Sequence, residues 1–237
     1  MENTNFVKYK TTIICFKMEI FDLTHPISEN MPMYPGTPAP TLQVAYSHKE
    51  YGFMETLINL YSHTGTHLDA PAHLYVNGLT LDEYPVEHFV GKALTVDCRA
   101  LKKGEKISMS LIEEKWNCLN EAEFILFFTG HDKLWGSQDY FSDFPILSEE
   151  AVEWINRRKL KGIGIDAPSF DPVTIDELDG ASGELHNHRA ILKTNNTILL
   201  ENLCNLEKVD SDLFLLCALP LKTVNADGAP ARVIAFR

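Results

Sequence analysis

Short runs of β-branched, aromatic and other apolar residues recur along the chain, and polar segments containing Gly, Pro, Asn or Asp separate them. Such runs, some of which alternate between apolar and polar positions, are typical of β-strands roughly four to eight residues long. The expected strands are residues 21–27, 41–47, 54–61, 93–98, 124–128, 162–166, 197–201, 213–218 and 232–236. The pattern therefore predicts a chain rich in strands.

Two segments carry the signals of helices instead. Ser110 and Glu113 have the spacing of a capping box, which predicts a helix that starts there and runs through Leu119. A second helix is expected to begin at Ser148, because the two glutamates that follow it favour the positive end of a helix dipole. The basic residues 157–159 suit the last turn of this helix for the opposite reason. Many strands with a few helices predict the α+β class.

No repeat, low-complexity linker or change of composition divides the chain. A length of 237 residues, of which 45% are hydrophobic, is enough for one β-rich domain with a single core. The first seventeen residues look detached from the rest, and their short apolar run, residues 12–16, is too brief for the core of a signal peptide. We therefore expect an N-terminal extension over residues 1–17 and a single domain over residues 18–237.

Composition narrows the range of partners. A formal net charge of -12 argues against binding to nucleic acids or to anionic membranes. No apolar run reaches the roughly eighteen residues that a membrane span needs. The five cysteines form no Cys-x-x-Cys pair, which is typical of reduced, buried cysteines in a cytoplasmic protein.

Residues 63–73 concentrate three histidines and one aspartate, all potential metal ligands, in eleven positions. Their sequence is His-Thr-Gly-Thr-His-Leu-Asp-Ala-Pro-Ala-His. Gly65, Pro71 and the threonines argue against a helix, so we expect a strand that runs into a loop. Fully extended, His63 and His67 would lie roughly 13 Å apart, too far to bind one ion, and a bend at Gly65 would bring them together. Pro71 is expected to carry His73 onward past such an ion.

These residue types favour a catalytic metal site over a structural one. Structural zinc sites are usually closed and rich in cysteine thiolates, whereas this cluster combines imidazoles with the carboxylate of Asp69. Mixed ligation of this kind is typical of an ion that keeps a position open for water. His63, His67 and Asp69 are therefore candidate ligands, and His73 is a better candidate for a general acid or base than for a ligand.

The motif resembles the His-x-Gly-Thr-His-x-Asp-x-Pro-x-His signature of the cyclase family, the metal-dependent hydrolases that include bacterial kynurenine formamidases. The resemblance extends to most of the chain from Met18. It includes the segments around residues 18–27, 34–36, 128–135, 164–167 and 201–203. It implies a swivelling β/β/α fold with a mixed, barrel-like sheet, and a binuclear site that holds two divalent metal ions, usually zinc and sometimes manganese.

The resemblance also assigns roles by position. His63, His67 and Asp69 would hold the first ion, Asp69 would bridge to the second, and His73 would be the general acid/base. His188 and Glu201 occupy the contexts that supply the remaining ligands of the second ion. His186 competes with His188, since a strand would place both histidines on one face.

The activity implied is hydrolysis of a small aromatic amide by a metal-bound hydroxide, as in the conversion of N-formylkynurenine to kynurenine and formate. Tyr34 is the candidate substrate-binding residue, because formamidases carry an aromatic residue there. Other candidates for an aromatic wall are Phe53, Trp135 and Tyr140. Hydrolysis of a cyclic amide such as isatin, a non-catalytic metal-binding role and phosphoester hydrolysis are the alternatives. Family members are commonly dimers or tetramers, so a homo-oligomer is expected.

Overall fold

The computed structural model describes residues 18–102, 104–173, 185–194, 196–209 and 213–237, so the expected extension 1–17 lies outside the described residues. The strands are β1 (Ile20–Asp22), β2 (Thr41–Tyr46), β3 (Glu55–Asn59), β4 (His67–Asp69), β5 (Val90–Asp97), β6 (Lys106–Ile107), β7 (Phe124–Phe128), β8 (Ile146–Leu147), β9 (Gly162–Ile165), β10 (Ile198–Glu201), β11 (Phe214–Pro220) and β12 (Gly228–Phe236). The α-helices are α1 (His48–Tyr51), α2 (Met109–Glu113), α3 (Trp116–Leu119), α4 (Glu149–Arg158) and α5 (His186–Leu192).

Eight strands form one mixed sheet in the order β1-β12-β11-β5-β7-β9-β10-β4, and a further pairing of β4 with β12 closes it. The closed circuit contains seven of the eight strands, because β1 lies outside it on the edge of β12. The neighbours from β5 to β10 pair in parallel, and β4, β11 and β12 pair antiparallel. The predicted α+β class with a barrel-like sheet is confirmed.

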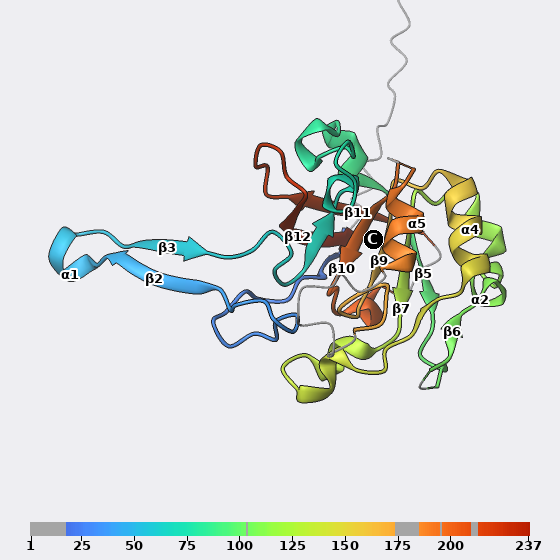
Figure 1. Cartoon of the computed structure of the whole chain (residues 1–237), viewed down its shortest axis with the longest axis horizontal. Helices are drawn as coiled ribbons and strands as arrows, with labels where there is room; N and C mark the ends of the chain where they lie inside the picture. The colour runs from blue at the N-terminus through green and yellow to red at the C-terminus, as the bar shows by residue number, and fades with distance from the viewer. Residues whose placement is uncertain (1–17, 103, 174–184, 195, 210–212) are drawn as a thin grey trace, which may run out of the picture.

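Alternating residues of these strands face two different hydrophobic cores, so the expectation of a single core is wrong. In β7, Phe124 and Leu126 belong to a core inside the closed sheet, whereas Ile125 and Phe127 belong to a second core outside it. The outer core is completed by apolar residues of α2, α4 and α5, which cover that side of the sheet in Figure 1. Both faces of β7 are therefore buried, as its continuous apolar run requires.

The helices at the outer core correct one prediction and confirm another. The capping box at Ser110 and Glu113 is wrong, because the chain before Met109 is extended at Ser108 and Ser110 already lies inside α2. The expected helix is also interrupted, and α3 forms separately after Lys115. The helix expected from Ser148 is confirmed as α4, in which the Ser148 hydroxyl accepts a hydrogen bond from the Ala151 N–H.

Each of the nine strands expected by residue range overlaps an observed strand, but some boundaries differ. The first is shorter than expected, since β1 ends at Asp22 and only an isolated bridge at Thr24 continues its pairing. The last is longer, because β12 includes Gly228 and Pro230, two residue types that weaken strand predictions. None of the described helices is long and apolar enough to cross a membrane.

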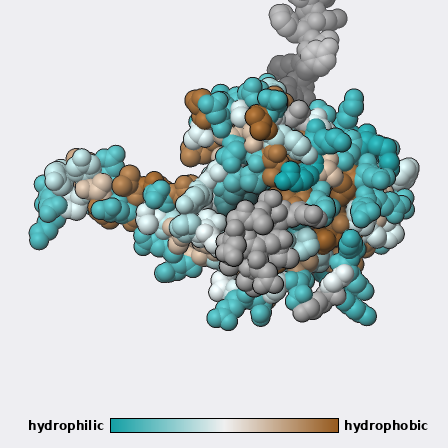
Figure 2. All heavy atoms as spheres, viewed as in Figure 1, coloured by the Kyte–Doolittle hydropathy of each residue, from teal (hydrophilic) through white to brown (hydrophobic). Residues whose placement is uncertain are grey.

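The antiparallel pair of β2 and β3 extends from the body as an arm, with α1 at its tip (Figure 1). Apolar side chains lie along this arm in Figure 2, and most of them are exposed to solvent. The exposed apolar residues of the arm are Val44, Tyr46, Tyr51, Phe53, Met54, Leu57, Ile58 and Tyr61. An apolar strand pair that covers no core within the described residues is unusual for an isolated subunit.

Candidate metal centre

The register of β4 and β10 brings three candidate ligands to one face of the closed sheet. Glu201 lies opposite His67, and Leu200 lies opposite Leu68. Leu68 and Leu200 fill the inner core, so the alternating residues His67, Asp69 and Glu201 project to the other face. All three are almost completely buried.

The bend at Gly65 brings His63 beside this face. Gly65 has a φ of 65°, a conformation that favours glycine, and the His63 and His67 ring centroids lie 5.2 Å apart. A second glycine makes room for the His63 ring. A Cβ atom on Gly228 would lie 2.5 Å from His63 Cε1, so this strand position next to Asp69 has space for no larger residue.

His73 returns to the cluster, and the expectation that Pro71 would carry it past is wrong. Ala70 is extended, as the following proline favours, but residues Pro71–His73 then form a 3-10 turn. That turn places the His73 ring 4.0 Å from the His63 ring, between centroids. Ligand atoms of His63, Asp69 and His73 lie within 4.8 Å of one another, so geometry alone does not separate a ligand from an acid or base here.

His188 reaches the cluster from α5, not from the strand expected in the sequence. Successive helical residues are rotated by about 100°, so His186 and His188 face different directions. His186 is exposed, whereas His188 is buried with its Nε2 atom 3.3 Å from Asp69 Oδ2 and 3.0 Å from Glu201 Oε1. The strand that was expected to hold both histidines is therefore wrong.

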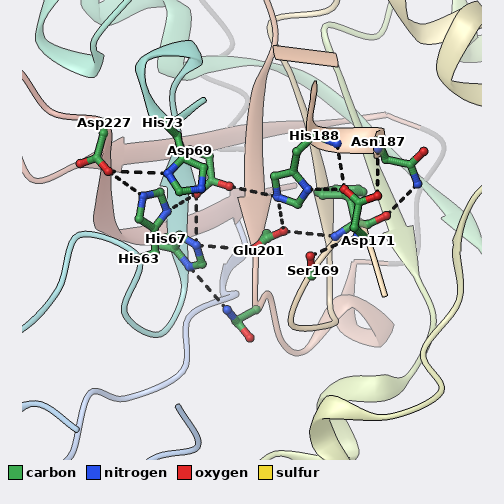
Figure 3. A network of polar contacts seen from close by, with 12 residues as sticks. His63, His67, Asp69, His73, Ser169, Asp171, Asn187, His188, Glu201 and Asp227 are labelled. Carbon is green, nitrogen blue, oxygen red and sulfur yellow. Dashed lines mark hydrogen bonds and ion pairs between the residues drawn. The ribbon is translucent and has the colours of Figure 1, made fainter. Parts of the chain in front are cut away.

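The donor atoms form two groups that meet at Asp69 (Figure 3). Asp69 Oδ1 lies 2.6 Å from His63 Nδ1 and 3.2 Å from His67 Nε2. The other carboxylate oxygen, Oδ2, faces His188 Nε2. Glu201 also faces both sides, because its second oxygen lies 3.4 Å from His67 Nε2. Asp69 is thus placed between a two-histidine group and a group formed by His188 and Glu201.

Each of the three histidines nearest Asp69 has its remote ring nitrogen held by an acceptor. His188 Nδ1 lies 2.7 Å from Asp171 Oδ2, and His63 Nε2 lies 3.0 Å from Asp227 Oδ2. His67 Nδ1 donates to the Gly65 carbonyl at 2.7 Å. Such partners fix the orientation of an imidazole and leave its other nitrogen free for a ligand. Sequence reasoning missed both aspartates, since no spacing distinguishes them among the many carboxylates of the chain.

Electrostatics in the cluster favour positive charge between the carboxylates. Burial would raise the pKa of Asp69, but His63 and His67 beside it outweigh burial and hold that pKa well below its usual range. Burial lowers the pKa of His63, yet Asp69 and Asp227 overcome this and raise it to about 10. Two buried carboxylates are costly without cations nearby. The nitrogen and oxygen donors present fit zinc or manganese, and these ions would supply the required charge.

His73 differs from the other histidines of the cluster in its surroundings. About 28% of its side chain is exposed, compared with 4% for His67 and His188. Burial nevertheless lowers the pKa of His73, and Asp69 only partly compensates. A partly exposed imidazole that is neutral near pH 7 can take up a proton from water and release it.

Hydrogen bonds and ring contacts connect three aromatic residues, Tyr140, Phe141 and Tyr34, to the backbone carbonyl that holds His67. Tyr140 is fully buried, and its hydroxyl donates to Asn202 Oδ1 at 2.7 Å. The Asn202 amide donates in turn to the same Gly65 carbonyl that holds His67. Phe141 packs edge-on against both Tyr140 and Tyr34, with centroids 5.2 and 6.2 Å apart.

The remaining aromatic candidates lie elsewhere. Tyr34 is 41% exposed, and its ring packs against Phe141. Trp135 stacks on His25 with centroids 3.9 Å apart. Phe53 belongs to the exposed arm, beside Tyr46 and Tyr51. Hydrogen bonds connect Tyr140 to the histidine cluster through Asn202 and the Gly65 carbonyl.

The chain is similar to several known proteins. The Cyclase family model, described as "Putative cyclase", matches residues 21–172, a segment that contains β4 and the histidines at 63, 67 and 73. Kynurenine formamidase of Erythrobacter litoralis is 30% identical over 230 residues, which cover 91% of this chain and 92% of the relative. Isatin hydrolase A of Labrenzia aggregata, solved with benzyl benzoate, superposes with a TM-score of 0.78 at 26% identity, covering 92% of this chain and 93% of that structure.

A further solved structure, described as a potential metal-dependent hydrolase with cyclase activity, has a TM-score of 0.70 and 29% identity. The match covers 92% of this chain and 98% of that structure. The family model matches more than half of the chain, and these relatives are covered almost completely. The chain therefore belongs to the Cyclase family.

Proposed function

We propose that this chain is a binuclear metal-dependent hydrolase of carbon–nitrogen amide bonds, with an N-formyl arylamine such as N-formylkynurenine as its substrate. The observation that carries the proposal is the position of Asp69, whose Oδ1 atom faces His63 and His67 and whose Oδ2 atom faces His188, while His73 lies beside His63. The names of the similar proteins, kynurenine formamidase and isatin hydrolase, support a reaction at an amide bond.

In this proposal His63, His67 and Asp69 hold one ion, and Asp69, His188 and Glu201 hold the other. The ions are zinc or manganese, which suit imidazole and carboxylate donors. When bound, such ions lower the pKa of water and polarise a carbonyl group. The protein contributes buried carboxylates, which attract the cations. It also contributes histidines whose orientation is fixed by hydrogen-bond acceptors at their remote ring nitrogens.

His73 is the proposed general acid/base. Water adds to the amide carbonyl carbon, and His73 takes the proton that the water loses. The carbon–nitrogen bond then breaks, and His73 gives that proton to the leaving nitrogen, so formate and an arylamine are released. A partly exposed imidazole beside the ligands is suited to both transfers.

An aromatic leaving group is expected to pack against an apolar side chain of the protein. Tyr34 is the proposed substrate-binding residue, because the contacts of Phe141 connect it to Tyr140 and so to the residues behind His67. Truncation of Tyr34 to alanine is expected to raise KM more than it lowers kcat, since the ring would contact the substrate away from the scissile bond.

A cyclic amide is the second candidate substrate. The structural similarity to an isatin hydrolase at 26% identity favours it, and the same donors would act on a ring amide. Ring opening leaves one product, whereas a formamidase releases formate, so formate detection distinguishes the two reactions. A chain that binds metal and hydrolyses neither amide would have the non-catalytic role.

We also propose that the protein is a cytoplasmic homodimer or homotetramer in which the arm packs on a second copy. The arm exposes a set of apolar side chains that no described part of the chain covers, including Tyr46, Tyr51 and Leu57. A cytoplasmic location is supported by the described cysteines, all of which are free. Light scattering of wild type and of Leu57→Asp tests the association: the variant is expected to be monomeric, and an unchanged mass would contradict the role of the arm.

The experiment that tests the function is an assay of N-formylkynurenine and isatin with metal-depleted protein refilled with zinc or manganese. Formate release that requires the metal is expected with N-formylkynurenine. Turnover of isatin alone would select the second candidate, and no turnover with two bound ions would contradict an amide hydrolase.

A further inference from the structure

Asp227 touches two histidines of the cluster at once. Its Oδ2 atom lies 3.0 Å from His63 Nε2 and 3.7 Å from His73 Nδ1. The Ser62 hydroxyl donates to the same oxygen at 3.3 Å. Figure 3 shows Asp227 on the side of His63 that faces away from His188. One carboxylate oxygen is therefore shared by a candidate ligand of the first ion and the candidate acid/base.

The backbone around Asp227 is fixed on both sides. Its carbonyl accepts a hydrogen bond from the Ala70 N–H at 2.8 Å, which ties it to the end of β4. The next residue, Gly228, begins β12 and pairs with Asp69. Asp227 is thus held by the same strand that carries the bridging carboxylate. Its side chain is 46% exposed, so it contributes little to the packing of the hydrophobic core.

We propose that Asp227 is a positioning residue for the first ion and for His73. By holding His63 Nε2, it keeps Nδ1 turned toward Asp69, and by facing His73 it keeps that ring beside His63. This inference rests on the proposed function for its catalytic half, whereas its metal-binding half stands on the donor geometry alone.

Asp171 holds His188 in the way that Asp227 holds His63, so the two aspartates can be compared. Asp171 accepts hydrogen bonds from His188 Nδ1 and from the backbone N–H groups of Asn187 and His188. Asp171 thus supports the group of donors on the other side of Asp69 and also anchors the start of α5. Loss of Asp227 is therefore expected to weaken the first ion alone, because His188 and Glu201 keep their own supports.

The test measures ion binding before activity. Zinc content per chain and zinc affinity, the latter by chelator competition, are compared for wild type, Asp227→Ala and Asp227→Asn. Asp227→Ala is expected to bind one ion roughly 10- to 100-fold more weakly, the usual effect of losing a partner behind a metal-bound histidine, and the other ion unchanged. Asp227→Asn is expected to lose less, because its amide oxygen can still accept from His63.

The matched control is Asp97→Ala, which removes another half-exposed aspartate. Asp97 is the last residue of β5. Its side chain is 55% exposed and pairs with Arg99, two residues farther along the chain. It is expected to leave the affinity of both ions unchanged. Without metal, the Asp227 variants are expected to stay folded by circular dichroism and to unfold at a slightly lower temperature than wild type, because they lose the contact with His63.

At zinc concentrations that fill both positions, the Asp227→Ala chain is further expected to show a kcat at least tenfold lower with KM within about threefold, because His73 has lost its partner. Equal affinity of wild type and Asp227→Ala for both ions would overturn the inference. If wild type itself bound no divalent ion, the proposed function would fail as well, so the two failures are distinguishable.

Discussion

Glu201 lies directly opposite His67 where β10 pairs with β4, and its Oε2 atom is 3.4 Å from His67 Nε2. The same carboxylate turns its other oxygen to His188 Nε2 at 3.0 Å. Two strands and a helix that are distant in the sequence thus meet at one buried acid. A pairing register, and not a local motif, completes the site.

Replacing Glu201 by Gln is expected to remove one of the two ions. The variant keeps the size of the side chain and loses the charge that would face a cation beside His188. Measured zinc content should fall from two ions per chain to about one, and hydrolysis should fall with it. Glu207→Gln, which removes an acid paired with Lys133 at 2.7 Å, is the control and should retain both ions. Two tightly bound ions in the Glu201 variant would refute this ligand role.

His73→Ala is expected to retain its metal and to hydrolyse the amide about 10² to 10⁴ times more slowly, the usual contribution of a general acid/base. The comparison is made at equal zinc occupancy, verified by metal analysis. Loss of an ion from this variant would instead identify His73 as a ligand, in agreement with its proximity to His63 and Asp69.

Gly228→Ala is expected to lose metal affinity without losing the fold. The added Cβ atom would collide with the His63 ring, whose nearest atom would lie 2.5 Å away, and the ring would have to move from Asp69. Circular dichroism reports the fold and chelator competition reports the affinity. Gly91→Ala is a control in another strand of the sheet, where the nearest atom is the carboxylate end of Glu123, a flexible side chain. Wild-type zinc affinity in the Gly228 variant would disprove the steric argument.

Stability is expected to depend on pH through Asp166. Burial raises its pKa to about 7 in the fold, although Thr129 and Gly130 donate hydrogen bonds to it. The folded chain therefore binds more protons at Asp166 than the unfolded chain does. Its contribution to stability is fully present below the ordinary value of 3.8 and is lost as the pH rises through about 7.

Urea unfolding of metal-free wild type and Asp166→Asn at several pH values checks this sign. The free energy of unfolding of wild type, relative to the variant, should decrease between about pH 4 and 7 and stay constant above. A difference that increased with pH would mean that Asp166 is preferentially ionised in the fold.

The sequence predicted much of the fold because strand signals are local. The apolar run of β7 and the cap and charges of α4 specify those elements by themselves. α5 was missed because its histidines occur in a short segment without a capping side chain at Leu185. Packing against β10 and α4, a tertiary effect, contributes to holding this helix in place.

The site was predictable to the extent that its residues are close in the sequence. His63, His67 and Asp69 lie within one motif, and the bend at Gly65 follows from elementary geometry. The return of His73 depends on a 3-10 turn that no spacing specifies. Asp171 and Asp227 reach their histidines through the closure of the sheet and the position of α5, so only the three-dimensional structure identifies them.

The central claim is that amide hydrolysis depends on the ions held around Asp69. The most direct measurement is formate release from N-formylkynurenine by metal-depleted protein before and after refilling with zinc or manganese, with bound ions counted in the same samples. No activity is expected without metal, and activity should return at two ions per chain. Asp69→Asn is expected to lose the bound ions and the activity. Full activity in the metal-depleted chain, or in Asp69→Asn, would contradict the central claim.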